Sequence, residues 1–299
     1  MKTCFTSLIT LLLIPVLHAQ LPRPASGTIR RVVNFPSRFV EPRNVDIWLP
    51  DGYDPKKKYA VLYMQDGQML FDSTTSWNKQ EWGIDETLGG LQARKLIRDC
   101  IVVGIWNGVV LQHAEYFPQK AIDFIPPAYR PELMPLIRNK PMADDYLKFM
   151  VKELKPWVDS AYSTSPDRKN TFVAGSGMGG LISLYAVCEY PEVFQGAACL
   201  STHWLGTYDV KDNPVPDAIV QYLKSRIPKS SEHKLYFDHG TTSLDSSYGP
   251  LQKKVDELFE ANGYDASNYN SREFAGEGSS ENSWNKRFYI PAIFLLRGN

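Results

Sequence analysis

One stretch of the chain, residues 171–180, combines a short β-branched and aromatic run with a cluster of glycines. Its sequence is Thr-Phe-Val-Ala-Gly-Ser-Gly-Met-Gly-Gly, and the apolar run 181–187 follows directly. β-Branched and aromatic residues favour a strand, whereas glycine permits backbone conformations that other residues rarely adopt. The pattern therefore predicts a strand, a sharp turn and a helix, with Gly177 at the turn.

The chain has 299 residues, which suits one large α/β domain as well as two smaller ones. Its hydrophobic fraction of 43% and charged fraction of 22% are typical of a globular protein. The formal net charge is zero, so the composition predicts no basic face and argues against a nucleic-acid partner.

The N-terminus has the features of a signal peptide over residues 1–19. Lys2 precedes an apolar run at 8–17, and we expect cleavage near Ala19 and export to the periplasm or the medium. That run is too short to span a bilayer as a helix, and no other segment is a transmembrane candidate. The proline-rich residues 20–27 are expected to be a mobile lead-in, and residues 28–299 a single domain.

Export would leave three cysteines, Cys100, Cys188 and Cys199, all in apolar runs. An odd number leaves at least one thiol free and excludes a disulfide framework. Buried, inert thiols are the favoured interpretation. A Cys188–Cys199 disulfide stays open as the alternative.

Apolar runs that suit buried strands alternate with segments of helical spacing along the chain. This alternation predicts an α/β fold with a mostly parallel central sheet and helices on both faces. Ligands of such sheets bind beyond the carboxyl ends of the strands. The proline-rich residues 113–142 are expected to be an irregular cap or pocket wall. Strands are expected at 28–35, 45–49, 59–64, 101–105, 171–174, 196–200, 235–238 and 271–274, and helices at 85–96, 144–162, 178–189, 248–261 and 284–296, the last kinked at Pro291.

Several short pieces, in this order and spacing, resemble one known family. They are Pro-Asp-Gly-Tyr at 50–53, Tyr-Met-Gln-Asp-Gly-Gln at 63–68, Glu-Tyr at 115–116, the glycine frame at 175–179, Ser-Thr-His-Trp at 201–204, Asp-x-Gly at 238–240 and Glu-x-x-Trp at 281–284. The chain resembles the putative-esterase (esterase D-like) family of α/β-hydrolases, which includes feruloyl, acetyl-xylan and siderophore esterases. The resemblance implies the α/β-hydrolase fold.

An active member of that family uses a serine, an acid and a histidine in this chain order. The resemblance puts the serine position at Gly177, the acid at Asp245 and the histidine position at Ser279. None of the five histidines in the sequence follows Asp245. Glycine cannot attack a carbonyl, and a serine hydroxyl cannot act as a base at neutral pH.

The two losses belong together, because triad members act as a unit. Losing one member of a triad costs about as much rate as losing all of them, roughly 10⁶-fold in a well-studied case. A paired loss is what drift after the loss of catalysis would give. The sequence therefore predicts a catalytically degenerate esterase.

A ligand pocket is expected to survive this loss. The oxyanion hole of the fold uses backbone N–H groups, which the resemblance puts at Met178 and near Gly67 and Gln68. An acylated carbohydrate, aryl ester or related ligand is the expected partner, and no cofactor is implied. Tryptophans are expected to form aromatic walls of this pocket, and Trp106 and Trp204 are the best placed to do so. His203 is also expected to contact the ligand.

The alternative hypothesis is a working carboxylic-ester hydrolase with an unrecognised nucleophile or a metal-bound water. Ser176 stands beside the turn, and Ser243 and Ser279 are lesser candidates for the nucleophile. No metal-ligand spacing such as His-x-x-x-His is present. The ligands that such a metal would need could come from His203, His239, Asp66 and Asp245.

Overall fold

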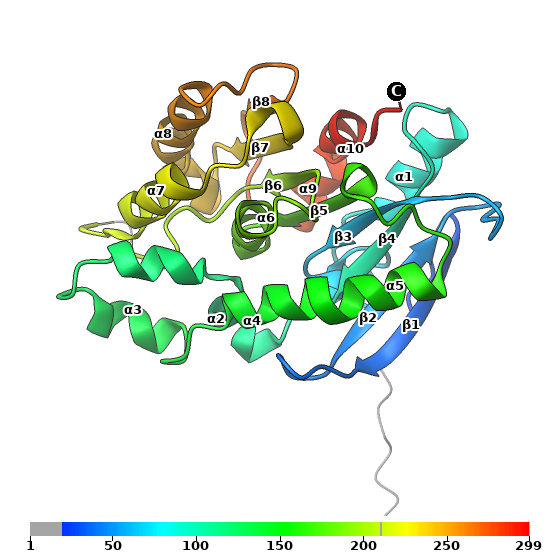
Figure 1. The fold of residues 1–299 in the computed structure, drawn as a ribbon, viewed down its shortest axis with the longest axis horizontal. Helices are drawn as coiled ribbons and strands as arrows, with labels where there is room; N and C mark the ends of the chain where they lie inside the picture. Colours follow the sequence, from blue (N-terminus) through cyan, green and yellow to red (C-terminus); the bar gives the residue numbers. More distant parts are fainter. Residues whose placement is uncertain (1–19, 210, 299) are drawn as a thin grey trace, which may run out of the picture.

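The structure is a computed structural model that describes residues 20–209 and 211–298. Eight strands of this part of the chain form a single sheet, in the order β1-β2-β4-β3-β5-β6-β7-β8 (Figure 1). Strands β1 and β2 are antiparallel to their neighbours, and the others run parallel. The bounds are β1 Thr28–Phe35, β2 Arg43–Leu49, β3 Ala60–Met64, β4 Cys100–Ile105, β5 Thr171–Ser176, β6 Gly196–Leu200, β7 Lys234–Gly240 and β8 Tyr269–Phe274.

The central strands are buried on both faces, as their unbroken apolar runs predict. Every residue of β3, β4, β5 and β6 is buried. The register pairs Met64 with Ala174 and Ser176 with Leu200. The loops after these parallel strands therefore leave the sheet at one edge, where a ligand site is expected.

Helices cover both faces of the sheet, which confirms the predicted α/β class (Figure 1). One core cluster contains residues of α4, α5, α6, α7 and α8, and a second contains residues of α1, α9 and α10. The bounds are α1 Ile84–Ala93, α2 Gln112–Tyr116, α3 Arg130–Leu136, α4 Ala143–Lys148, α5 Lys155–Ala161, α6 Met178–Glu189, α7 Val215–Arg226, α8 Gly249–Glu260, α9 Glu281–Arg287 and α10 Tyr289–Leu296.

Two predicted helices are divided in the structure. The segment expected at 144–162 is α4, a π-helical turn at Phe149–Leu154, and α5. The last helix begins at Glu281 and breaks at Phe288 rather than at Pro291. Pro291 lies in the first turn of α10, where a missing N–H removes no helical hydrogen bond. Helix α7 was not predicted, although Val215, Ala218, Ile219, Tyr222 and Leu223 have helical spacing and are buried.

The region 113–142, expected to be an irregular cap or pocket wall, is largely helical and belongs to the core. It contains most of α2, a 3₁₀ turn at Gln119–Phe124, and α3. Tyr116, Phe117 and Leu133 are buried in the larger core cluster. The aromatic residues that suggested a ligand wall are therefore used for packing.

Residues 20–27 are held against the domain at several points. Asp85 accepts a hydrogen bond from the Ala25 N–H at 2.6 Å, and the indole N–H of Trp48 donates to the Ser26 carbonyl at 2.7 Å. The Gly27 N–H donates to Asp51 at 3.0 Å. These contacts anchor the segment that was expected to be a mobile lead-in. The predicted signal peptide, residues 1–19, lies outside the described residues.

The three described cysteines are free and buried, so Cys188 and Cys199 form no disulfide. Burial raises the pKa of the Cys100 thiol to about 12, which keeps it protonated and unreactive. This confirms the interpretation as inert thiols. None of the helices formed by residues 20–209 and 211–298 has the length and apolar character needed to cross a membrane.

Candidate functional site

The predicted turn is present between β5 and α6. Gly177 adopts φ 55° and ψ −120°, in the left-handed half of backbone space that strains other residues. A Cβ added at Gly177 would meet nothing within 4 Å. A Cβ at Gly175 would lie 2.6 Å from the Gly179 backbone, and one at Gly179 would lie 2.9 Å from Asp66. Close packing thus requires the two outer glycines, whereas the position at the apex has room for a side chain.

A cavity of about 300 Å³ opens beside this turn, at the carboxyl edge of the parallel strands. Gly177 and Ser279 both line it, although they lie 102 positions apart in the sequence. The loop after β8 carries Ser279, whereas the loops after β3 and β4 contribute amide and carboxyl groups. The two positions where the sequence predicts a lost triad member therefore share one cavity.

The predicted acid, Asp245, is fully buried and has three hydrogen-bond donors. Its Oδ2 accepts from the Gly240 N–H at 2.7 Å and from the Ser201 hydroxyl at 2.6 Å. The Ser279 hydroxyl donates to the other oxygen, Oδ1. The residue at the predicted histidine position is therefore the one that contacts the predicted acid from the cavity side.

A buried polar network supports this carboxylate from behind. The Ser201 hydroxyl accepts hydrogen bonds from the Trp284 indole at 2.9 Å and from the Arg287 guanidinium at 3.0 Å. Arg287 also pairs with Asp238 at 2.9 Å. Ser201 and Trp284 belong to the sequence pieces that carried the family resemblance, but their spacing alone did not reveal the network.

The backbone groups of a possible oxyanion hole lie in the predicted region, with one change. Met178 begins α6, so its N–H has no acceptor within the helix. Met178 and Gln68 line the cavity. Gly67 packs against β4, where an added Cβ would lie 2.5 Å from the Gly104 backbone, and it does not face the cavity. Of the two positions expected in that loop, only Gln68 lines the cavity.

Asp66 lines the cavity, whereas the sequence suggested only a role as a metal ligand for it. Its backbone is left-handed, with φ 56° and ψ 45°. Its Oδ1 accepts hydrogen bonds from the Asn107 amide at 2.6 Å and the Gln112 amide at 2.7 Å. Burial raises the pKa of Asp66 from 3.8 to about 6. The hydrogen bonds from the two amides oppose this rise, and the negative charge of Glu281 adds to it.

His203 lines the cavity as predicted, but one of its ring nitrogens is hydrogen-bonded to a tyrosine. Nδ1 lies 2.6 Å from the Tyr248 hydroxyl. Burial lowers the pKa of His203 to about 4, with His113 as a second cause, so the imidazole is neutral at neutral pH. His239 bonds through Nδ1 to the Gly240 carbonyl and does not line the cavity.

Trp106 and Trp204 were predicted to face the ligand, and the structure places both elsewhere. Trp106 donates to Asp46 at 2.9 Å and lies under the Arg31 guanidinium. Trp204 is only 2% exposed and donates to Gln252 inside the core. A position after a strand does not fix the direction of a side chain. The tryptophans that line the cavity are Trp77, Trp82 and Trp284.

A strand–turn–helix elbow above a mostly parallel, helix-covered sheet is the arrangement of α/β-hydrolases. Within that class, the sequence model of the family described as "Putative esterase" matches residues 37–293. The chain belongs to this family.

Curated relatives at 25% identity include two proteins of Bacillus subtilis (strain 168). One is the uncharacterized protein YjcH, aligned over 57% of this chain and 60% of its own length. The other is ferri-bacillibactin esterase BesA, aligned over 52% of both chains. An endo-1,4-beta-xylanase/feruloyl esterase of Xylanibacter ruminicola aligns over 64% of this chain and 24% of its own length. The chain thus spans less than two thirds of each of these relatives.

Solved structures of esterases share the fold. A ferulic acid esterase superposes with a TM-score of 0.65 at 16% identity, covering 92% of this chain and 99% of its own. The enterobactin esterase FES of Shigella flexneri was crystallised in the presence of 2,3-di-hydroxy-N-benzoyl-glycine. It superposes with a TM-score of 0.64 at 16% identity, covering 92% of this chain and 60% of its own. At such identities the superpositions show the fold alone.

Proposed function

We propose that this protein is a non-catalytic member of its esterase family that retains the cavity and binds an ester ligand there. One observation carries the proposal: Gly177 stands at the apex of an intact elbow, while the Ser279 hydroxyl bonds the acid Asp245 in place of a histidine. The cavity thus offers neither a nucleophile nor a base at the positions that the family chemistry requires.

The lining of the cavity favours a neutral ligand, such as an acylated carbohydrate or an aryl ester. Its described lining contains two carboxylates, Asp66 and Glu281, and no lysine or arginine. An anionic ligand would be repelled there, as like charges disfavour each other at short range. Trp77, a residue that is 82% exposed, offers a flat face for a sugar or an aromatic ring.

Hydrolysis assays test this proposal directly. The purified protein, comprising residues 20–299, is incubated with 4-nitrophenyl acetate and with methyl and sugar esters of aromatic acids. We expect no turnover above the uncatalysed rate, together with saturable binding of at least one sugar or aryl ester. Turnover that disappears on substitution of a cavity residue such as Ser176 would overturn the proposal.

An active hydrolase remains the second candidate, and one observation favours it. Ser176 lines the cavity next to the elbow, and the neutral imidazole of His203 lines it too. Labelling by a fluorophosphonate, lost in Ser176→Ala, would establish this route. A metal-bound water has less support, because the described residues bring no three His, Cys, Asp or Glu side chains together as a metal site.

Export is proposed on the sequence of residues 1–19 alone. Lys2 and the apolar run 8–17 support a cleaved signal peptide. Expression of the full chain in a bacterial host, followed by N-terminal sequencing of the periplasmic fraction, should yield a mature chain that starts near Gln20. Retention of the intact chain in the cytoplasm would refute the assignment.

A further inference from the structure

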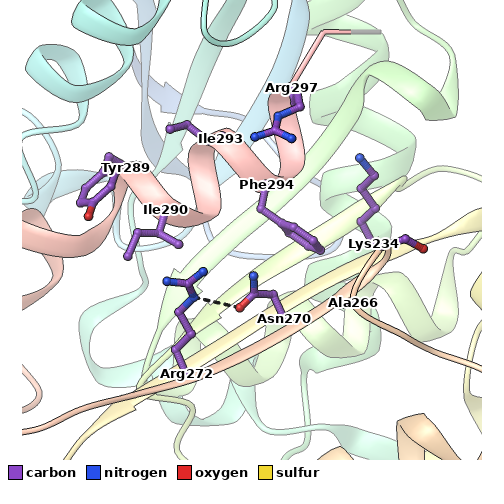
Figure 2. A pocket seen from close by; sticks show the side chains of 10 residues that line it. Lys234, Ala266, Asn270, Arg272, Tyr289, Ile290, Ile293, Phe294 and Arg297 are labelled. Atoms are coloured by element: carbon purple, nitrogen blue, oxygen red, sulfur yellow. Dashed lines mark hydrogen bonds between the residues drawn. The ribbon is translucent and has the colours of Figure 1, made fainter.

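A second hollow lies far from the elbow, between helix α10 and the last two strands of the sheet. Its volume is about 460 Å³, and we call it the α10 pocket (Figure 2). Its floor is formed by Ile290, Ile293 and Phe294 of α10. Their i, i+3, i+4 spacing puts them on one face of the helix, yet each is only partly buried. The three side chains pack against the second core cluster on one side, and their remaining accessible surface forms the apolar floor of the pocket.

Three cationic side chains lie around this floor, and Figure 2 shows Arg297 above Phe294, Lys234 to its right and Arg272 below Ile290. Lys234 comes from the start of β7, Arg272 from β8 and Arg297 from the end of α10. The Lys234 ammonium lies 5.9 Å from the centre of the Phe294 ring. The Nε of Arg272 donates to Asn270 at 3.0 Å, which leaves its terminal nitrogens for another acceptor.

These cations lack the partners that surface cations usually have. Within residues 20–209 and 211–298, none of the three forms an ion pair with a carboxylate, and no Asp or Glu lines the pocket. Burial and the positive charges of Arg98 and Arg297 lower the pKa of Lys234. The local charge is therefore uncompensated, and a bound anion would relieve the repulsion.

We propose that the α10 pocket binds a small organic anion with a flat apolar body, of the arylcarboxylate class. The carboxylate would lie between Arg272 and Arg297, and the ring would rest on Phe294 and Ile290. Arg pairs with carboxylates through parallel hydrogen bonds, and the pocket volume falls within the range of small-molecule sites, about 300–1,000 Å³. The elbow cavity has the opposite charge character, so the two sites select different ligands.

The test compares two isosteric probes on the folded domain. Binding of 2-naphthoate and of neutral 2-naphthamide is measured by ligand-observed NMR and by calorimetry. We expect the carboxylate to bind about tenfold more tightly, the usual effect of a charge-assisted hydrogen bond, and to weaken with added salt. In Arg272→Gln/Arg297→Gln this preference should disappear, while Phe294→Ala should weaken both probes.

Lys253→Gln is the matched control, because Lys253 is an exposed lysine of α8 outside the pocket. Its naphthoate affinity should equal that of the unmodified protein. Both arginines are exposed, so the double variant should fold, and each single variant is measured beside it. Equal affinity for the two probes, or a carboxylate preference that survives the double substitution, would overturn the proposal. Binding to phosphatidylglycerol vesicles without binding to naphthoate would overturn it in favour of a membrane-facing surface.

Discussion

The Ser279 hydroxyl donates a hydrogen bond to the Asp245 carboxylate, joining the loop after β8 to the loop after β7. In a serine hydrolase this acid orients a histidine and stabilises the imidazolium that forms during the reaction. A hydroxyl satisfies the buried carboxylate as a hydrogen-bond donor but cannot accept a proton at neutral pH. The donor that reaches Asp245 from the cavity side is thus a serine hydroxyl.

The double variant Gly177→Ser/Ser279→His should gain ester hydrolysis. Position 177 has open space for a side chain, and its backbone already has the elbow conformation. Each single variant should stay at least about 10³-fold below the double variant, because triad members act as a unit. Release of 4-nitrophenol from 4-nitrophenyl butyrate gives the rates.

Asp245→Asn in that double variant is the control, and it should remove about 10⁴-fold of the gained rate, since the imidazole would lose its correct tautomer. A folded double variant without any turnover would show that the acid or the Met178 and Gln68 amides are not aligned for catalysis.

Ser201→Ala should destabilise the fold by about 2–3 kcal/mol. The hydroxyl of Ser201 serves Asp245, Trp284 and Arg287 at once, and its removal would leave buried polar groups without a partner. Urea unfolding measures the effect. Ser246→Ala, which removes an exposed hydroxyl bonded only to the Ser243 carbonyl, should stay within about 0.5 kcal/mol. Equal losses for the two variants would contradict a supporting role for Ser201.

Asp66 should make the free energy of unfolding depend on pH. Its pKa is about 6 in the folded protein and 3.8 ordinarily, so between these values the folded state keeps a proton that the unfolded state has lost. The stabilisation that Asp66 provides is therefore greatest at low pH and falls as the pH rises from about 4 to about 6. Above about pH 6 it no longer changes.

Asp66→Asn should abolish this component, because an amide does not titrate. Relative to the unmodified protein, the variant should gain stability steadily from about pH 4 to about pH 6 and then level off. Urea titrations across this range give the difference directly. A difference that does not change with pH would show that Asp66 titrates at its ordinary value.

Two tryptophans should respond oppositely to truncation. Trp77→Ala should weaken ester-ligand binding by about 1 kcal/mol and leave stability nearly unchanged, because Trp77 is 82% exposed at the cavity rim. Trp204→Phe, which keeps a ring in the core but loses the bond to Gln252, should lower stability by about 1–2 kcal/mol and spare binding. Calorimetry measures ligand binding, and thermal unfolding measures stability. A reversed pattern would indicate that Trp204 contacts the ligand.

The sequence predicted the elbow correctly because every residue that forms it is contiguous. The β-branched run before Gly175 and the apolar run after Gly179 carry their own strand and helix preferences, and the two outer glycines allow the close packing of the turn. The prediction of an irregular cap at the proline-rich residues 113–142 was wrong, because the packing of these residues depends on distant parts of the chain. Whether Phe117 faces a ligand or packs in the core depends on helices that contact it from elsewhere in the chain.

The sequence by itself determined the fold class and the absence of a serine at the elbow and of a histidine after Asp245, because these follow from local pattern and chain order. Only the tertiary structure decided which groups face the cavity. Trp106 and Trp204 turn away from it, and Ser279 meets Asp245. The cations of the α10 pocket, at positions 234, 272 and 297, likewise come together only through folding. Side-chain direction and long-range contact depend on the packing of the whole domain, which no short stretch of sequence specifies.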